Sequence, residues 1–325
     1  MEKRLSVIIP NHNGSVSIGK CLEAAFSANY GNFEVIVVDD CSTDDSVETI
    51  KRYPCRLIRL NKRSGAGAAR NAGAENSTGE ILFFTDADCL MQHDALALAN
   101  KAVTEHPGAV IGGTYTPLPF DTDFFSAFQS LFIHYSETKN KEPDYIAGHA
   151  MVIDAGLFKA SGGFRKKYLS IPEDVEFSHQ LRRTGLRLIM RPEIQAMHMF
   201  DFTLMKSLRN ALRKSMELTR YSLMNRDLLA DSGTASVELK VSVACLFLNA
   251  LLAAVSLLRR EQLYLVPISF LFAFNLFVCR GLIKTFFRAK GLSFSILATL
   301  YWVAGYSTAV GVGALAGLVK YALRR

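Results

Sequence analysis

Ile81-Leu82-Phe83-Phe84-Thr85-Asp86-Ala87-Asp88 has the pattern of a buried strand that ends at two carboxylates one residue apart. Side chains two positions apart on an extended segment point the same way, so Asp86 and Asp88 can bind the same hard cation or contact the same phosphorylated ligand. Two charges at a strand end reduce sheet stability, and the pair therefore indicates a site. Asp-x-Asp alone is a weak signal because short acidic turns are common, so its meaning depends on the surrounding sequence.

Strand and helix patterns alternate on the N-terminal side of this pair. Their order is strand 5–10, helix 17–28, strand 33–39, helix 46–52, strand 55–60, helix 66–75 and strand 81–85. This order predicts right-handed β-α-β units in a mostly parallel sheet, on which ligands bind beyond the carboxyl ends of the strands. Polar residues at 11–13, 39–40 and 86–88 fall at those ends, so the sequence predicts that they share one site.

The positive charge of the chain is confined to its C-terminal part. The formal net charge is +7, but residues 240–325 carry ten basic side chains and one acid, which leaves 27 basic and 29 acidic residues before them. The basicity therefore belongs to a hydrophobic region, which argues against nucleic-acid binding. The six cysteines form no Cys-x-x-Cys pair, which favours a reducing compartment. The N-terminus leads directly into a strand pattern, and we expect no signal peptide there.

Three apolar runs, at 239–258, 263–279 and 292–319, predict two or three transmembrane helices. Buried helices of a soluble domain fit less well, because the first two runs have no polar face. The basic segment 280–290 should lie in the cytosol, and the N-terminal domain with it. The third run can span the membrane or form a re-entrant hairpin. Gly313-x-x-x-Gly317 within it is equally typical of close helix packing.

Residues 204–229 predict a basic amphipathic helix just before these runs, in which arginine and lysine alternate with leucine and methionine. Such a helix can lie in the headgroup layer of a membrane, and a surface helix packed on its own domain is the alternative. We therefore divide the chain into a soluble domain at 1–203, an interfacial helix and linker at 204–235, and a membrane domain at 236–325.

Several short motifs follow one another in a characteristic order. They are VIIPNHN at 7–13, VVDDCSTD at 37–44, GAARNAG at 67–73, DAD at 86–88, GHA at 148–150, GGF at 162–164, EDVEF at 173–177, LRR-x-G at 181–185, and PE at 192–193 followed by His198. Over residues 5–200 this order resembles the inverting glycosyltransferases of family 2. The resemblance implies an α/β catalytic domain of the GT-A type, Rossmann-like with a mostly parallel sheet, followed by an all-α transmembrane region.

The resemblance also implies a binding site for a nucleotide-diphosphate sugar that is linked to UDP or GDP. Its residues would be Pro10, His12, Asp39, Asp40, Arg70, Asp86, Ala87, Asp88 and Gly148. Asp40, beside Asp39, would accept a hydrogen bond from the base, and His12 would stack on it. Arg70 would neutralise phosphate or hold the ribose. Helix capping by the aspartates and a surface position for Arg70 are the simpler alternatives.

By the same resemblance, Mg²⁺ or Mn²⁺ would bind at Asp88, with Asp86 and His198 nearby. Asp86 would touch the ribose or a metal-bound water, and His198 would lie near the phosphates or the metal; a histidine of the core is the alternative. Hard oxygen ligands completed by substrate phosphates are the usual way in which Mg²⁺ is held.

Glu173 and Asp174 follow Pro172 at the start of a predicted helix. From spacing alone, they could equally be acids that stabilise a helix N-terminus. The resemblance implies that Asp174 is the general base that removes the proton of the acceptor hydroxyl, with Glu173 contacting the donor sugar or the acceptor. One base with in-line attack implies inversion at the anomeric carbon.

Processive polysaccharide synthases of the family carry a Gln-x-x-Arg-Trp motif after the base, and this chain does not; its one tryptophan, Trp302, lies in the last apolar run. We therefore expect transfer of a single sugar to a lipid or lipid-linked acceptor by an integral membrane enzyme. Its catalytic domain would be cytosolic, and the bacterial inner membrane is the expected location. A processive synthase, a non-catalytic nucleotide-sugar scaffold and a homo-oligomer stay open. Asn11-His12-Asn13-Gly14 is not a glycine-rich phosphate loop, which argues against a nucleotidyltransferase.

Overall fold

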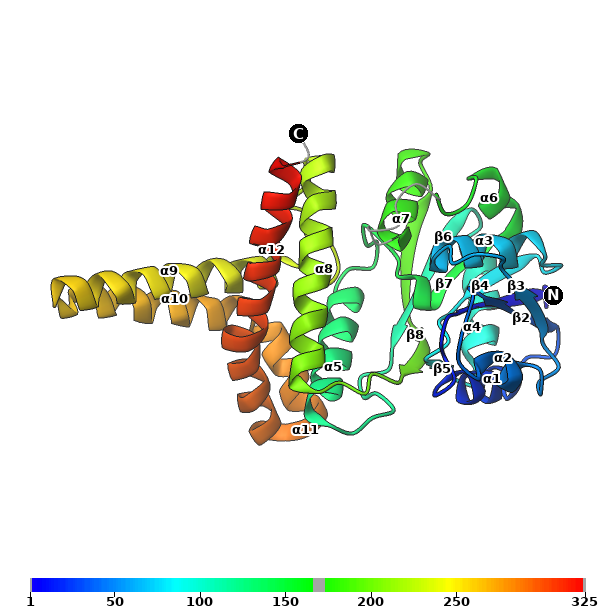
Figure 1. The fold of residues 1–325 in the computed structure, drawn as a ribbon, viewed down its shortest axis with the longest axis horizontal. Coiled ribbons are helices and arrows are strands. Elements are labelled where there is room, and N and C mark those ends of the chain that lie inside the picture. The colour runs from blue at the N-terminus through cyan, green and yellow to red at the C-terminus, as the bar shows by residue number, and fades with distance from the viewer. Residues whose placement is uncertain (1, 166–172, 324–325) are drawn as a thin grey trace. The chain divides into compact units, whose positions relative to one another are not determined.

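The computed structural model describes residues 2–165 and 173–323. These residues form two compact units (Figure 1). The sheet unit comprises Met1–Thr122 and Glu137–Asp201, and the helical unit comprises Asp123–Ser136 and Phe202–Arg325. Pro172, which the sequence places before a helix, lies outside the described residues.

The sheet unit alternates strands and helices over its N-terminal half, as the sequence predicts. Its elements are β1 (Leu5–Asn11), α1 (Ile18–Phe26), β2 (Phe33–Asp39), α2 (Ser46–Ile50), β3 (Arg56–Arg59), α3 (Ala66–Glu75), β4 (Ile81–Phe84), β5 (Cys89–Met91), α4 (Ala95–Glu105), β6 (Ala109–Tyr115), the 3₁₀ turn η1 (Gly148–Ala150), β7 (Met151–Asp154), α6 (Ala155–Ala160), α7 (Glu173–Arg183) and β8 (Arg187–His198).

Eight strands among the described residues form one sheet in the order β3-β2-β1-β4-β7-β6-β8-β5. The pairs β1–β2, β1–β4 and β2–β3 are parallel, as predicted, and so is β6–β8. The other three pairs, β4–β7, β6–β7 and β5–β8, are antiparallel. The α/β fold class is thus confirmed, but the sheet is parallel on one side and mixed on the other.

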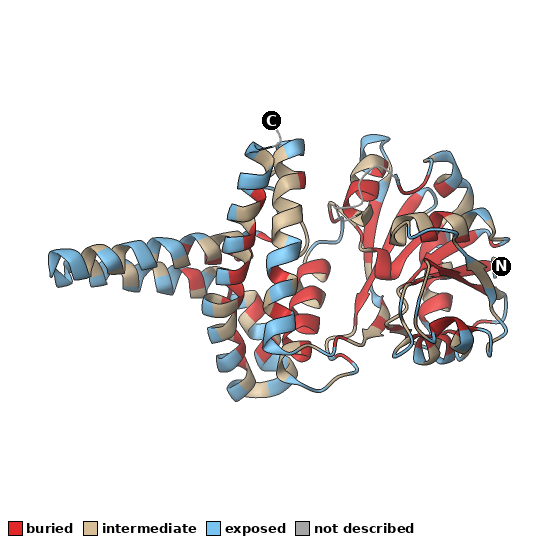
Figure 2. Cartoon of the chain, in the orientation of Figure 1, coloured by how far each residue is buried: buried red, intermediate tan, exposed pale blue. Residues whose placement is uncertain are grey.

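Helices cover both faces of this sheet, which places the strands in the interior (Figures 1 and 2). Val7 and Ile9 of β1 face a core that contains Leu22 of α1 and Leu96 of α4. On the opposite face, Ile8 belongs to a second core with residues of α6 and α7. Strands buried on both faces are almost continuously apolar, which is why β1, β2 and β4 are easy to identify in the sequence.

The helical unit consists of long helices. Its elements are α5 (Phe124–Thr138), which continues into the sheet unit at its end, α8 (Leu204–Asn225), α9 (Val237–Arg259), the 3₁₀ turn η2 (Gln262–Tyr264), α10 (Leu265–Val278), α11 (Arg280–Leu300), the π-helical turn η3 (Tyr301–Tyr306) and α12 (Ser307–Ala322). Inside α11, Gly291 has φ +78°, so the chain turns there between two helical pieces.

Helices α8 and α12 lie side by side over much of their length (Figure 1). A Cβ atom at Gly313 or Gly317 would collide with the backbone carbonyls of Leu212 and Met216 on α8. Gly313 and Gly317 therefore allow close helix packing, which is one of the two roles that the sequence left open.

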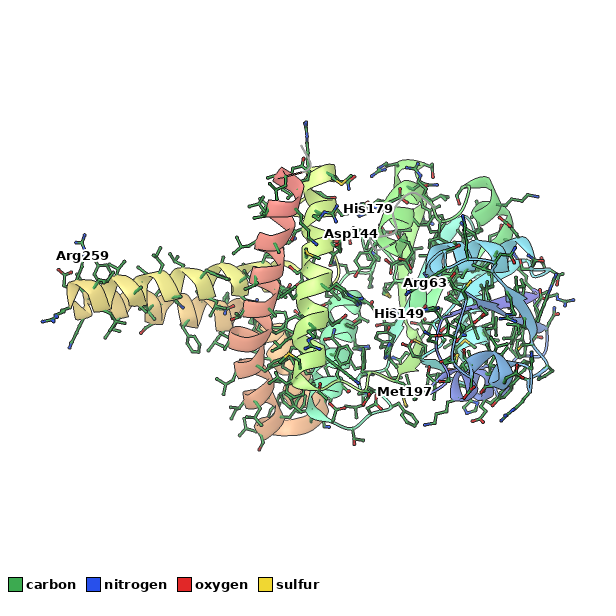
Figure 3. The ribbon with its side chains drawn as sticks, in the orientation of Figure 1. Arg63, Asp144, His149, His179, Met197 and Arg259 are labelled. Carbon is green, nitrogen blue, oxygen red and sulfur yellow. The ribbon has the colours of Figure 1, made fainter. Side chains whose placement is uncertain are left out.

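Helices α9 and α10 form a hairpin that extends away from the other helices of this unit and is mostly exposed (Figures 1 and 2). Arg259 lies at its far end (Figure 3). At its near end, Ser242 donates to Asn275 and accepts from Trp302 Nε1, both at 2.8 Å. These two buried hydrogen bonds connect α9 with α10 and with η3, so the polar groups of all three residues are satisfied by side chains of another element.

Two helical segments, Val237–Arg259 and Arg280–Ala322, are long and apolar enough to cross a membrane, although the second is interrupted at Gly291. The shorter apolar helix Gln262–Val278 lies between them. Their positions match the three apolar runs of the sequence. Length and composition give only weak support for membrane insertion, and the number of spans stays a prediction.

Candidate active site

A cavity of about 380 Å³ opens at the carboxyl ends of β1, β2 and β4. Its lining includes Pro10, Asn11, His12, Asn13, Gly14, Asp40, Arg70, Asp86, Ala87, Asp88 and Glu173. The three polar clusters predicted at the strand ends therefore meet in one place, and Glu173 at the start of α7 joins them.

Arg70 of α3 connects two parts of this cavity. Its Nη2 donates to Asp86 Oδ1 at 2.6 Å, and its Nη1 donates to Glu173 Oε1 at 2.8 Å. Its side chain is only 4% exposed. The guanidinium packs so closely against Gly148 that a Cβ atom at this glycine would lie 2.7 Å from it. We call Arg70, Asp86 and Glu173 the Arg70 bridge. Burial disfavours the charge on Arg70, but its two carboxylate neighbours outweigh burial and raise its pKa.

Asp86 and Asp88 have different surroundings, although they are two residues apart. Burial raises the pKa of Asp86, but the charge of Arg70 outweighs it and the pKa lies below its usual value. Burial and the charge of Asp86 raise the pKa of Asp88 to about 6. The ring of His198 lies close to Asp88, with Nε2 at 3.5 Å from Oδ2.

The surroundings of Asp88 fit a divalent cation. Its carboxylate lies beside a second carboxylate and an imidazole, and Asp88, Cys89 and His198 place their potential ligand atoms within 4.8 Å of one another. Carboxylate oxygens suit Mg²⁺ and Mn²⁺, and imidazole is also a common ligand of transition metals. A bound cation would compensate the charge that burial makes costly at Asp88.

Asp39 and Asp40 stabilise the loops that surround the cavity. Asp39 is fully buried and accepts from Asn11 Nδ2 at 3.1 Å. Asp40 accepts from the backbone N–H groups of Ser64 and Gly65 at 2.6 and 2.8 Å, just before α3. His12 is fixed by the contact of its Nδ1 with the Asp40 carbonyl at 2.8 Å. Both aspartates thus have structural roles in the loops, and Asp40 also lines the cavity.

Asp174 lies next to the cavity, in the first turn of α7. Its Oδ2 accepts from the backbone N–H of Gly148 at 3.2 Å, and its Oδ1 accepts from its own neighbour Val175 at 2.8 Å. Burial and the adjacent charge of Glu173 raise the pKa of Asp174. A carboxylate with a raised pKa is a better proton acceptor at neutral pH than an ordinary one.

The sequence prediction missed a buried ion pair beside Asp174. His149 (labelled in Figure 3) follows Gly148, and its Nε2 lies 3.5 Å from Glu137 Oε2. Thr114 donates to the same Glu137 oxygen at 2.7 Å, and the His149 ring stacks on Tyr115 with centroids 3.8 Å apart. Burial lowers the pKa of His149, but Glu137 outweighs burial and raises it. The motif at 148–150 could have indicated His149, but nothing in the sequence marks Glu137.

Residues 6–161 match the model of the family "Glycosyl transferase family 2". The chain therefore contains a glycosyltransferase domain of family 2. Among curated relatives, glycosyltransferase GlyA of Streptococcus pneumoniae is 30% identical over 119 residues, which are 35% of this chain and 17% of GlyA. Glycosyltransferase AglE of Haloferax volcanii is 40% identical over 116 residues, which are 34% of this chain and 38% of AglE. The similarity thus covers less than half of these relatives.

A solved structure of the mannosyltransferase PcManGT from Pyrobaculum calidifontis, in complex with GDP-Man and Mn²⁺, is similar to the whole chain. The TM-score is 0.61 at 19% identity, and the match covers 100% of this chain and 88% of that one. At this identity, the likeness shows the fold, and it agrees with the GT-A fold expected from the sequence.

Proposed function

We propose that this chain transfers a single sugar, with inversion, from a nucleotide-diphosphate sugar to a lipid or lipid-linked acceptor at a membrane. The observation that carries the proposal is the Arg70 bridge. Arg70 binds Asp86 at the strand end where the donor would bind. It also binds Glu173 at the start of α7, the helix that carries the candidate base Asp174.

On the donor side, His12 and Asp40 would recognise the nucleobase. Each carboxylate oxygen accepts more than one hydrogen bond, so Asp40 can hold the loop and still accept from a base. The GDP-Man and Mn²⁺ of the mannosyltransferase complex support a UDP- or GDP-linked donor and a divalent cation, Mg²⁺ or Mn²⁺. Asp88, with His198 beside it, would hold that cation, which when bound stabilises the charge that develops on the leaving diphosphate.

Asp174 would take the proton from the acceptor hydroxyl. The Gly148 N–H fixes Oδ2, which sets the direction in which the carboxylate faces. Glu173 is engaged by Arg70 at 2.8 Å, so its charge stays next to Asp174 and favours protonation of the base during attack. A single base acting opposite the leaving diphosphate gives inversion at the anomeric carbon.

The hairpin of α9 and α10 supports the proposal that the acceptor lies at a membrane. Residues 241–258 of α9 contain no charged side chain, and at 1.5 Å per residue they cover about 27 Å, close to the hydrocarbon thickness of a bilayer. Four basic residues, Arg280, Lys284, Arg288 and Lys290, follow the hairpin at its near end. The positive-inside rule would keep that end in the cytosol.

Within the helical unit, α12 runs crosswise to α9 (Figure 1), and Val312, Leu315 and Val319 are exposed along it. We therefore propose that the α9–α10 hairpin crosses the membrane while α8 and α12 lie along its surface. This proposal keeps the division of the chain into a catalytic domain at 1–203, an interfacial helix and linker at 204–235, and a membrane domain at 236–325. The catalytic domain would then be cytosolic, at the bacterial inner membrane.

The test compares Asp174→Asn with Asp94→Asn, because Asp94 is exposed and makes no capping hydrogen bond. Purified full-length protein is given UDP- and GDP-linked sugars, Mn²⁺ and membrane lipid extract, and release of nucleoside diphosphate and labelling of lipid are measured. Asp174→Asn should lower the turnover about 10²–10⁴-fold without changing donor affinity, and Asp94→Asn should behave as the wild type. Full turnover in Asp174→Asn would show that Asp174 is not the general base. Stepwise growth of a glycan on one acceptor would instead indicate a processive synthase.

A further inference from the structure

The 3₁₀ turn η1 (Gly148–Ala150) lies next to the candidate base, and its three residues are buried. On one side, the Gly148 N–H donates to Asp174 Oδ2 at 3.2 Å, and Gly148 packs against the Arg70 guanidinium. A hydrogen bond weakens steeply when its donor turns away from the acceptor. The contact between Gly148 and Asp174 therefore depends on what holds this turn in place.

His149 holds the turn on its other side. Its side chain is 7% exposed, and its ring stacks on Tyr115 of β6 with centroids 3.8 Å apart and planes 19° apart. Its Nε2 lies 3.5 Å from Glu137 Oε2. This distance suits an ion pair better than a strong hydrogen bond, and Nε2 has no hydrogen-bond partner in the part of the chain that the structure describes. The contact with Glu137 is therefore mainly electrostatic, and it requires the protonated ring.

Glu137, which belongs to the sheet unit, is fixed as well. Its side chain is 6% exposed, and the same Oε2 accepts from Thr114 at 2.7 Å. Thr114 and Tyr115 are neighbours on β6, so one strand supports both members of the pair. A buried ion pair is often less favourable than apolar residues of the same volume. Stability alone therefore does not explain why two charges are buried behind this turn.

Titratable groups from four elements face His149. Burial lowers its pKa, but Glu137 of α5 outweighs burial and raises it, with further contributions from Asp86 at the end of β4 and Asp174 of α7. Tyr115 of β6 is the fourth group, and burial raises its pKa well above the usual value. The interaction with Asp174 is mutual, so a protonated His149 favours the ionised form of Asp174, which is the form that can accept a proton.

We propose that His149 is a positioning residue for the transfer reaction: with Glu137 it holds η1 so that the Gly148 N–H stays on Asp174 Oδ2 while Asp174 takes the proton of the acceptor hydroxyl. Neither His149 nor Glu137 lines the donor cavity, so the pair acts through the turn and not through the nucleotide. The inference rests on the proposed function, in which Asp174 is the base.

The test separates positioning from folding and from donor binding. Full-length His149→Gln, Glu137→Gln and the double variant are compared with His93→Gln, which changes an exposed histidine of the same unit. Release of nucleoside diphosphate from UDP- and GDP-linked sugars is measured from pH 6 to 8.5 with saturating Mn²⁺ and membrane lipid extract. Calorimetry with GDP or UDP and Mn²⁺ gives the nucleotide affinity and the number of competent sites, to which turnover is normalised.

His149→Gln should lower turnover per competent site about 10- to 100-fold at pH 6, with little change in nucleotide affinity, and His93→Gln should behave as the wild type. The loss should shrink towards pH 8.5. The reason is that the wild-type ion pair is complete below about pH 6.5 and is lost as the pH rises through the raised pKa of His149. The double variant should melt closer to the wild type than His149→Gln, because Glu137 no longer lacks its partner, but its turnover should stay low.

Combination with Asp174→Asn shows whether His149 acts through the base. Adding His149→Gln to Asp174→Asn should cause no further loss, because the carboxylate that the turn positions is already absent. An undiminished further loss would overturn the positioning role, and so would turnover that recovers together with stability in the His149→Gln/Glu137→Gln variant. Full turnover in Asp174→Asn would refute the proposed function. Low turnover in Asp174→Asn with normal turnover in His149→Gln would refute the positioning role and leave that function standing.

Discussion

The Arg70→Ala substitution should lower the stability of the sheet unit by about 2–3 kcal/mol. Removing one partner of a fully buried ion pair costs about 3–5 kcal/mol, whereas an exposed pair contributes at most about 1 kcal/mol. The Arg70 side chain is 4% exposed, but those of Asp86 and Glu173 are 34% and 32% exposed. Water can therefore partly solvate the two carboxylates that the substitution leaves without a partner, and the expected cost lies between the two limits.

Thermal unfolding of the detergent-solubilised chain measures this effect. A domain of 150–250 residues loses about 2–4 °C of melting temperature per kcal/mol, so Arg70→Ala should melt about 4–12 °C lower. The matched control is Arg63→Ala, since Arg63 is exposed and makes no ion pair among the described residues. Adding Glu173→Ala to Arg70→Ala should restore part of the loss, because one unpaired carboxylate is then removed. Equal melting temperatures for Arg70→Ala and Arg63→Ala would refute the bridge.

The cost of Arg70→Ala should also depend on pH. Arg70 holds the pKa of Asp86 below its usual value. A carboxyl group whose pKa is depressed by folding contributes stability above its unfolded pKa, about 3.9 for aspartate, and this contribution is lost as the pH falls through the folded pKa. The difference between wild type and Arg70→Ala should therefore be complete at pH 7 and shrink below about pH 4. A constant difference over this range would contradict the electrostatic explanation.

Three further predictions concern neighbouring residues. Because the pKa of Asp88 is about 6, Mn²⁺-dependent nucleotide binding, measured by calorimetry, should weaken about tenfold per pH unit below pH 6; a flat profile would exclude Asp88 as a ligand. Gly148→Ala would bring a Cβ within 2.7 Å of the Arg70 guanidinium, so it should lower the melting temperature in wild type but have little effect in Arg70→Ala. Glu137 raises the pKa of His149, so this pair stabilises the fold fully below about pH 6.5, and its contribution is lost as the pH rises through the folded pKa. Melting curves from pH 5.5 to 8.5 should therefore show a loss for Glu137→Gln that is largest at low pH, and a loss that grows with pH would contradict this.

The N-terminal half of the sheet could be predicted because its signals are local. Helix 66–75 and strand 33–39 were predicted with the bounds that the structure shows, and strand 5–10 is one residue longer. The two strands are buried apolar runs that end at polar residues, and helix 66–75 lies between Gly65 and the polar residues Asn76 and Ser77. The polar strand ends also meet in one cavity, as expected from the parallel arrangement.

The other half of the sheet depends on pairings that the sequence does not specify locally. β7 has four residues and lies between β4 and β6, antiparallel to both. A strand this short has no periodicity that reveals its direction or its neighbours, and its place is determined by packing of the whole domain. For the same reason the sequence could mark Arg70 as a candidate residue but could not indicate that it binds Glu173, 103 residues further on.

The Arg70 bridge gives a physical reason for unequal roles of Asp86 and Asp88. A cation placed between two equivalent carboxylates would be shared by both, but the charge of Asp86 is already compensated by a guanidinium at 2.6 Å. His198 Nε2 is farther from Asp88, at 3.5 Å from Oδ2, and burial makes the charge of Asp88 costly. A cation therefore gains most from Asp88. One strong carboxylate ligand is too few to hold Mg²⁺ or Mn²⁺ firmly without substrate phosphates, so under the proposed function the cation should bind together with the donor and leave together with the nucleoside diphosphate.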